Sequence, residues 1–153
     1  MKNLLIRFAT DNDSKNIFDW RNDPLTRSMS HSTKIVDWKQ HAKWLANSLD
    51  SKNRVLLICE YDISNKIAVV RFDINESRAL ISINLNPSYR GKSLGKESLI
   101  QSIKFFSRKY PLIKKLFAEV NEENVASKKT FLGVGFEKFK VENHVGYYLK
   151  NLI

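Results

Sequence analysis

The chain has 153 residues and contains little cysteine, glycine or proline: one, five and three residues, respectively. Because Cys59 is the only cysteine, no internal disulfide can form, which fits a reducing compartment. Cys59 lies within the apolar run Arg54 to Tyr61, and this position predicts a small buried core residue rather than a nucleophile. The three histidines (His31, His41 and His144) are scattered, so we expect no metal site.

Long apolar runs are also missing from this sequence. The longest are only a few residues, and Met1-Lys2-Asn3 leads directly into Leu4 without a signal-peptide pattern. We therefore expect a cytoplasmic protein with no membrane partner.

Acidic residues are scarce relative to basic ones. The chain has 26 Lys and Arg against 16 Asp and Glu, a net charge of +10, and such an excess favours an anionic partner. The basic residues are spread over the whole chain and form no nucleic-acid-binding signature. A phosphorylated small molecule fits this charge, and we expect no nucleic-acid partner.

The segment from Asn84 to Lys96 is the most informative part of the sequence. It joins a strand-like run to a helical run through a short basic turn that contains Gly91 and Gly95. Glycines and a helix start let backbone N–H groups approach a phosphate. A Walker loop is excluded because Glu97 stands where Ser or Thr is required, and a dinucleotide fingerprint is excluded because only two glycines occur.

Two segments carry a family resemblance. Arg90 to Gly95 resembles the Arg/Gln-x-x-Gly-x-Gly/Ala acetyl-CoA loop of the GNAT acetyltransferase superfamily, with Ser93 in place of the usual first glycine. This substitution is tolerable if Ser93 has a negative φ, and its hydroxyl could itself donate to a phosphate oxygen. Downstream, Asn121 to Ser127, followed by Phe131 and Gly135-Phe136, resembles the second signature of the same family.

Hydrophobic periodicity predicts the same order of elements as that family's fold. The expected strands are 4–8, 54–61, 66–73, 78–85, 115–121, 136–141 and 146–151. The expected helices are one that follows the capping cluster 10–13 and contains residues 17–21, and three at 36–49, 94–109 and 124–132. The second helix should bury Trp38, Ala42, Leu45 and Leu49 on one face, and Asn22-Asp23-Pro24 should end the first. The expected architecture is α/β (α+β), the GNAT fold, with a single mixed, mostly antiparallel central sheet, flanking helices and one domain over residues 1–153.

The resemblance implies acetyl-CoA as co-substrate and no metal. The backbone of Ile83, Asn84 and Leu85 would pair with the pantetheine arm, and the loop would bind the pyrophosphate through Arg90, Gly91, Lys92, Ser93, Leu94, Gly95 and Lys96. Asn124 and Phe131 would contact the arm near the thioester.

Acetyl transfer to an amine also needs a base and an acid. Side chains along strand 115–121 point alternately to the two faces of the sheet, so Glu119 lies on the face opposite to that of Ala118 and Val120. Some members of the family use a glutamate at this position as the base. Phe131 stands where many members have a tyrosine that protonates the thiolate. Ser127, Tyr147, Tyr148, water or an unassisted thiolate are the alternatives.

The acceptor depends on the N-terminal third. The Arg21-Asn22-x-Pro motif, with Trp38 and His41, resembles the branch that acetylates nucleotide-linked amino sugars in the pseudaminic and legionaminic acid pathways. We therefore expect a small-molecule amine, Arg21 on its diphosphate, and a monomer or homodimer. Two alternatives stay open: the same fold acting on a protein N-terminus, a polyamine or an aminoglycoside, and a catalytically weak binding module.

Overall fold

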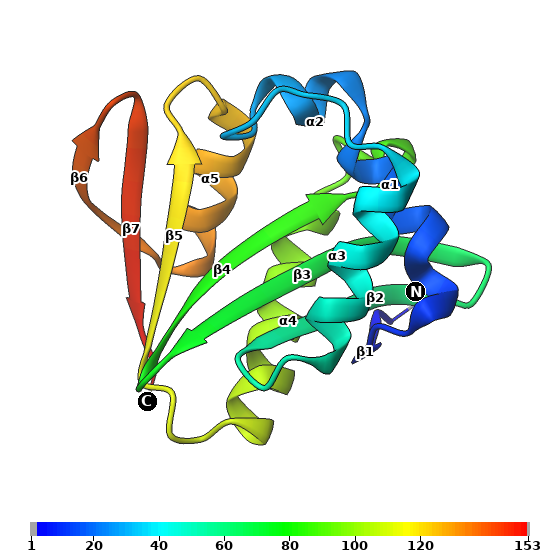
Figure 1. Ribbon diagram of the computed structural model, residues 1–153. Coiled ribbons are helices and arrows are strands. Elements are labelled where there is room, and N and C mark those ends of the chain that lie inside the picture. The colour runs from blue at the N-terminus through cyan, green and yellow to red at the C-terminus, as the bar shows by residue number, and fades with distance from the viewer. Residues whose placement is uncertain (1–2, 153) are drawn as a thin grey trace.

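A computed structural model describes residues 3–152, so the two ends of the predicted domain lie outside the described residues. One seven-stranded sheet runs in the order β1-β2-β3-β4-β5-β7-β6, and only β4 and β5 pair in parallel (Figure 1). The predicted mixed, mostly antiparallel sheet with flanking helices is confirmed. The strands are β1 (Leu5–Phe8), β2 (Arg54–Asp62), β3 (Asn65–Asn75), β4 (Arg78–Leu85), β5 (Lys115–Asn121), β6 (Glu137–Glu142) and β7 (Val145–Asn151).

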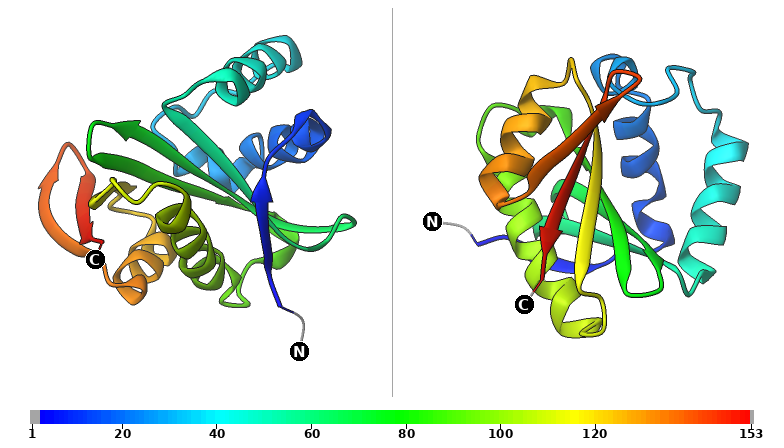
Figure 2. Two further views of the ribbon diagram at one scale, coloured as in Figure 1. Left: turned by 90° about the horizontal axis from the view of Figure 1, so that it is seen from below. Right: turned by 90° about the vertical axis from the view of Figure 1, so that its left-hand side faces the viewer.

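The helices lie on both faces of the sheet. They are α1 (Ser14–Arg21), α2 (Pro24–Ser28), α3 (Trp38–Asp50), α4 (Leu94–Lys109) and α5 (Val125–Val134), and short 3-10 turns span Asp11–Asp13 and Pro87–Tyr89. Figure 2 shows α4 and α5 on one face and α1 and α3 on the other. We call the face that carries α1 and α3 the front face and the other the back face. Among residues 3–152, no helix has the length and apolar character that crossing a membrane requires.

Alternating side chains of the strands fill two cores. The back-face core contains Phe72, which stacks on Phe106 of α4 with ring centroids 3.9 Å apart. Cys59 is fully buried in this core, as predicted, and burial raises the pKa of its thiol to about 11. The smaller front-face core holds Ile17 and Trp20 of α1 and Leu45 of α3. Both layers are therefore tied to the same strands.

A buried ion network fixes the start of the first helix. Asp13 is fully buried and accepts hydrogen bonds at 2.8 Å from both terminal nitrogens of Arg7, whose Nε also donates to Glu60. Lys66 Nζ lies 2.8 Å from Asp13 Oδ1. Burial pushes the pKa of Asp13 upward, but the hydrogen bonds from Arg7, Lys66 and the Thr10 N–H outweigh this and hold it at about 2. The carboxylate thus joins β1, β3 and α1.

The N-terminal helices differ from the sequence expectation in two ways. Pro24 does not only end α1: it begins α2, with the Asp23 carboxylate accepting a hydrogen bond from the Thr26 N–H at 3.1 Å. The face of α3 that the sequence predicts to be buried is only partly buried. His41, Leu45 and Ser48 are buried, whereas 47% of Trp38 and 37% of Leu49 are exposed. The buried His41 contacts the Ser14 carbonyl oxygen and Arg21 Nη1.

Candidate active site

The loop between β4 and α4 gathers the predicted phosphate ligands at a helix N-terminus. Ser93 is the residue before α4, and its φ of +59° is left-handed. The condition of a negative φ is therefore not met, and the turn needs here the conformation that glycine adopts without strain. Gly91 also has a positive φ, +73°. A Cβ added at Gly95 would lie 3.9 Å from Thr130 Cγ2 of α5, its nearest neighbour.

The N-terminus of α4 has no side-chain cap among the described residues. Asp23, Asp37 and Asn124 accept hydrogen bonds from the first turns of α2, α3 and α5, whereas the Ser93 side chain makes no such bond to α4. First-turn N–H groups that lack a partner need another acceptor, and a phosphate is suited to them. The uncapped turn fits a pyrophosphate.

The cations of this loop differ in their surroundings. The Arg90 guanidinium forms an ion pair with Asp23 and donates to Thr26 Oγ1 at 3.1 Å, so it is bound to α2. Lys92 Nζ lies 5.6 Å from the centre of the Tyr89 ring, and the Lys96 side chain lies beside Gly133 of α5. Lys92 and Lys96 have no carboxylate partner among residues 3–152. These two lysines are the cations that remain available to an anion.

Strands β4 and β5 separate next to this loop. They pair at Arg78, Ala79 and Leu80 and not beyond the Leu80–Phe117 pair, although β4 continues to Leu85 against β3. Figure 1 shows the two strands diverging from that point. The backbone of Ile83, Asn84 and Leu85 therefore has no strand partner on its β5 side and can pair with an extended ligand.

The first residues of α5 lie on the far side of this separation. Asn124 caps α5, because its Oδ1 accepts a hydrogen bond from the Ser127 N–H at 3.1 Å. This leaves the Asn124 side-chain amide nitrogen for another acceptor. Phe131 is only 4% exposed and packs edge-on against Phe136. It is mainly a core residue here, and a ligand can reach only its edge.

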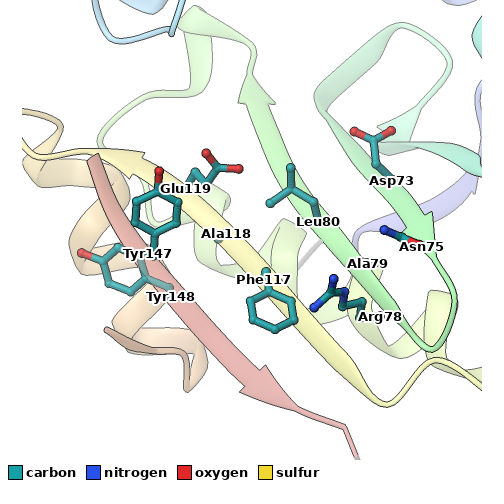
Figure 3. Close-up of a pocket in the computed structure, with 10 residues that line it drawn as sticks. All are labelled: Asp73, Asn75, Arg78, Ala79, Leu80, Phe117, Ala118, Glu119, Tyr147 and Tyr148. Carbon is teal, nitrogen blue, oxygen red and sulfur yellow. The ribbon is translucent and has the colours of Figure 1, made fainter. Parts of the chain in front are cut away.

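A pocket of about 300 Å³ opens on the sheet beside the point where β4 and β5 separate. Its lining, drawn in Figure 3, comprises Asp73, Asn75, Arg78, Ala79, Leu80, Phe117, Ala118, Glu119, Tyr147 and Tyr148. Glu119 is exposed between the buried residues Ala118 and Val120, as the alternation predicts. Its carboxylate therefore reaches the solvent-filled front of the sheet.

Two groups flank the Glu119 carboxylate. Tyr147 is its direct cross-strand partner on β7, so the two side chains lie on one face of the sheet. His31 Nε2, in the segment between α2 and α3, lies 4.0 Å from Glu119 Oε1. Tyr148 points the other way and is fully buried, with a hydroxyl that has no partner among the described residues. Tyr147 is thus the tyrosine hydroxyl that shares the front pocket with Glu119.

The four predicted acceptor residues come together, but their surroundings differ. Asn22 exchanges two 2.8 Å hydrogen bonds with the backbone of Val36, which fixes the loop before α3. Trp38 is half-exposed and packs edge-on against Phe18. His41 is fully buried. Arg21 is partly exposed and stacks on Trp44, with its Cζ 4.4 Å from the ring centre.

Sequence reasoning missed three residues beside Arg21: Trp44 of α3, Arg71 of β3 and Arg54 of β2. Arg54 Nε donates to Asp73 Oδ1 at 2.6 Å, and Arg71 Nε lies 3.3 Å from Asp73 Oδ2. A second pocket, of about 610 Å³, is lined by Trp44, Arg54, Asp73 and neighbouring residues. A charged residue within the apolar run Val69-Val70-Arg71-Phe72 was the sequence signal that could have identified Arg71.

Comparison with known proteins assigns the family of this chain. Residues 3–137 match the model of the acetyltransferase (GNAT) domain, and the chain belongs to the GNAT family of N-acetyltransferases. Among residues 3–152, no group of three or more His, Cys, Asp and Glu side chains is placed to hold a metal ion.

An uncharacterised protein of Methanocaldococcus jannaschii is 28% identical over 140 residues, which are 90% of this chain and 28% of that protein's length. A domain crystal structure from the same organism is 28% identical with a TM-score of 0.84, covering 99% of this chain and 100% of that one. A spermidine N-acetyltransferase from Vibrio cholerae, solved with CoA and spermine, is 16% identical with a TM-score of 0.83, covering 97% and 95%. At that identity the likeness concerns the fold.

Proposed function

We propose that this chain transfers the acetyl group of acetyl-CoA to the amine of a nucleotide-linked amino sugar. The observation that carries the proposal is the separation of β4 from β5 after the Leu80–Phe117 pair. It leaves one edge of β4 unpaired between an uncapped helix N-terminus and the pocket that contains Glu119. The pyrophosphate of the donor matches the helix N-terminus, and its extended arm matches the unpaired edge of β4. The amine of the acceptor matches the pocket.

The residues of the chain fit each part of the donor. The first-turn N–H groups of α4, with Lys92 and Lys96, would hold the pyrophosphate, and the backbone of Ile83 to Leu85 would pair with the arm. Asn124, through its free amide nitrogen, and the edge of Phe131 would contact the arm near the thioester. When bound, acetyl-CoA supplies an acetyl group on a thiol leaving group.

Glu119 would accept the proton of the attacking amine. An aliphatic ammonium must lose a proton before it can attack, and a carboxylate in hydrogen-bond reach provides that step. Glu119 is 33% exposed at its side chain and faces His31, which can pass the proton to solvent. Phe131 stands where many family members have a tyrosine that protonates the thiolate. We favour Tyr147 as the side chain that takes this role.

The charges beside the pocket favour an anionic acceptor. Arg21, Arg71 and Arg78 lie along the front face, where Asp73 is already paired with Arg54. A polyamine or an aminoglycoside is itself a cation, and these arginines would repel it. A diphosphate would be attracted.

One assay tests this proposal directly. Thiol release from acetyl-CoA is measured, under one condition, with free and nucleotide-linked 4-amino sugars, a ribosomal-protein N-terminal peptide and spermidine. We expect the nucleotide-linked sugar to be the best acceptor. Faster turnover of the peptide or spermidine would refute the acceptor class and favour the alternative one. Absence of thiol release with every amine would favour a binding module.

A further inference from the structure

Two guanidinium groups on the front face are incompletely paired. Arg21 makes no ion pair with a carboxylate among residues 3–152, and its one hydrogen-bond contact is with His41. Arg71 has a buried Nε atom without a hydrogen-bond partner, although Asp73 lies 3.3 Å away. Asp73 instead accepts the 2.6 Å hydrogen bond of Arg54. Arg54 and Arg71 therefore share the carboxylate of Asp73, and Arg21 has none within the described part of the chain.

The arrangement is electrostatically unfavourable without a ligand. Burial lowers the pKa of Arg21, and the charge of Arg71 lowers it further. Burial also lowers the pKa of Arg71; the charge of Asp73 opposes this shift and the charge of Arg54 adds to it. A desolvated cation beside a second cation costs free energy unless an anion compensates both.

Arg21 is nevertheless held in a fixed orientation. His41 Nε2 lies 2.9 Å from the Ser14 carbonyl oxygen, which can only accept, so Nε2 carries the proton. In the neutral ring Nδ1 is then an acceptor, and it lies 3.2 Å from Arg21 Nη1. The Trp44 ring supports the flat face of the guanidinium. These contacts orient Arg21 without neutralising it, which is the arrangement that anion recognition needs.

The sheet register places Arg71 on the same face as the pocket. Arg71 pairs with Ser82 across β3 and β4, and Leu80 pairs with Phe117 across β4 and β5. Two residues further along β5 stands Glu119, which pairs with Tyr147. Arg71, Ser82 and Glu119 thus lie on the same face of the sheet, although Ser82 and Glu119 stand beyond the last paired residues of β4 and β5. With strands about 4.8 Å apart, the backbones of Arg71 and Glu119 are at least roughly 10 Å apart.

We propose that Arg21 and Arg71 form a phosphate-binding subsite on the front face, walled by Trp44, that takes a phosphoryl group of the acceptor while its amine lies at Glu119. Both guanidinium groups can donate to one phosphate, and charge-assisted donors of this kind bind phosphate well. His41 is a positioning residue for Arg21. The proposal rests on the proposed function only in assigning the phosphate to the acceptor.

The test uses inorganic pyrophosphate as the probe, with CoA saturating so that the loop before α4 is filled. We expect calorimetry to show one pyrophosphate bound per wild-type chain. Arg21→Gln and Arg71→Gln should each weaken this binding about tenfold or more, the effect expected for a lost charge-assisted contact. Arg108→Gln, which removes an exposed positive charge on α4, should bind as wild type does. Malonate, a dicarboxylate, should bind more weakly than pyrophosphate.

Four results would overturn the subsite. They are an unchanged pyrophosphate affinity in Arg21→Gln or Arg71→Gln, an equal loss of affinity in Arg108→Gln, no pyrophosphate binding to the wild type, and tighter binding of malonate than of pyrophosphate. Thermal unfolding of each variant accompanies the titration, and Arg71→Gln should unfold at the same or a higher temperature than wild type.

Acceptor assays separate the two proposals. If the nucleotide-linked sugar is turned over with an unchanged KM in Arg71→Gln, the subsite is wrong and the function stands. Arginine-dependent pyrophosphate binding without turnover of that sugar supports the subsite and refutes the acceptor.

Discussion

Nδ1 of His41 accepts a hydrogen bond from Nη1 of Arg21, 3.2 Å away, because Nε2 of the same ring donates to the Ser14 carbonyl oxygen. A buried histidine on α3 therefore sets the orientation of an arginine at the end of α1. The motif residues Arg21 and His41 act as one unit, in which Arg21 faces the solvent side and His41 supports it.

This pair predicts a pH dependence of stability. Burial, together with the charge of Arg21, lowers the pKa of His41 below its ordinary 6.5. As the pH falls through 6.5, the unfolded chain binds a proton that the folded chain does not, so the free energy of unfolding decreases. Chemical denaturation at pH 7 and pH 5 should show this decrease in wild type and a smaller one in His41→Gln. An equal decrease in both would assign the effect to other groups.

The Asp13 network predicts a large stability effect. Asp13→Asn would leave Arg7 and Lys66 facing a neutral amide in a buried site, which should cost roughly 3 kcal/mol of unfolding free energy. Asp19→Asn is the matched control, since its ion pair with Lys15 is exposed on both sides, and it should cost less than about 1 kcal/mol. Denaturant unfolding of the two variants at neutral pH measures the difference, and similar losses would contradict the buried role of Asp13.

Several elements could be predicted from the sequence because a single local signal decides them. Helix α4 spans 94–109, as expected, because its apolar period is clear and Pro111 follows. Strand β5 has the predicted bounds because its alternation is strict. Helix α2 was missed, although Asp23 before Pro24 is a common helix start.

The remaining differences depend on tertiary contacts. The buried face of α3 is set by the His41 hydrogen bonds to α1, which no periodicity reveals. Arg90 was predicted on the loop alone, but its Asp23 partner is 67 residues away in the sequence. Arg71 became a candidate only when the sheet register placed it on the same face as Glu119.

We predict that the donor pyrophosphate binds next to Gly95. The protein leaves room for a methyl group at this position, since Thr130 Cγ2 would lie 3.9 Å from it. Any loss of CoA affinity in Gly95→Ala would thus reflect the ligand rather than the fold, and Gly95→Val should lose more. Calorimetry with CoA measures both, and thermal unfolding shows that both are folded. Wild-type affinity in a folded Gly95→Val would place the pyrophosphate elsewhere.

We predict that Glu119 is the general base in the pocket. If it accepts the amine proton, Glu119→Gln should lower kcat by about 10²-fold or more at pH 7, the usual scale for a lost general base. CoA affinity should stay close to wild type, because Glu119 lies on the front face and the loop before α4 is separate from it. Activity should recover at high pH, where the amine loses its proton without help.

The control for Glu119→Gln is Glu123→Gln, which makes the same change at an exposed position four residues away. Glu123→Gln should keep wild-type kcat, which would exclude a general effect of net charge. His31→Gln separates two routes for the proton, because His31 is 4.0 Å from Glu119 Oε1. If His31 only passes the proton onward, its loss should cost less than the loss of Glu119, since water can replace it. A larger effect of His31→Gln than of Glu119→Gln would make the histidine the base and the glutamate its support.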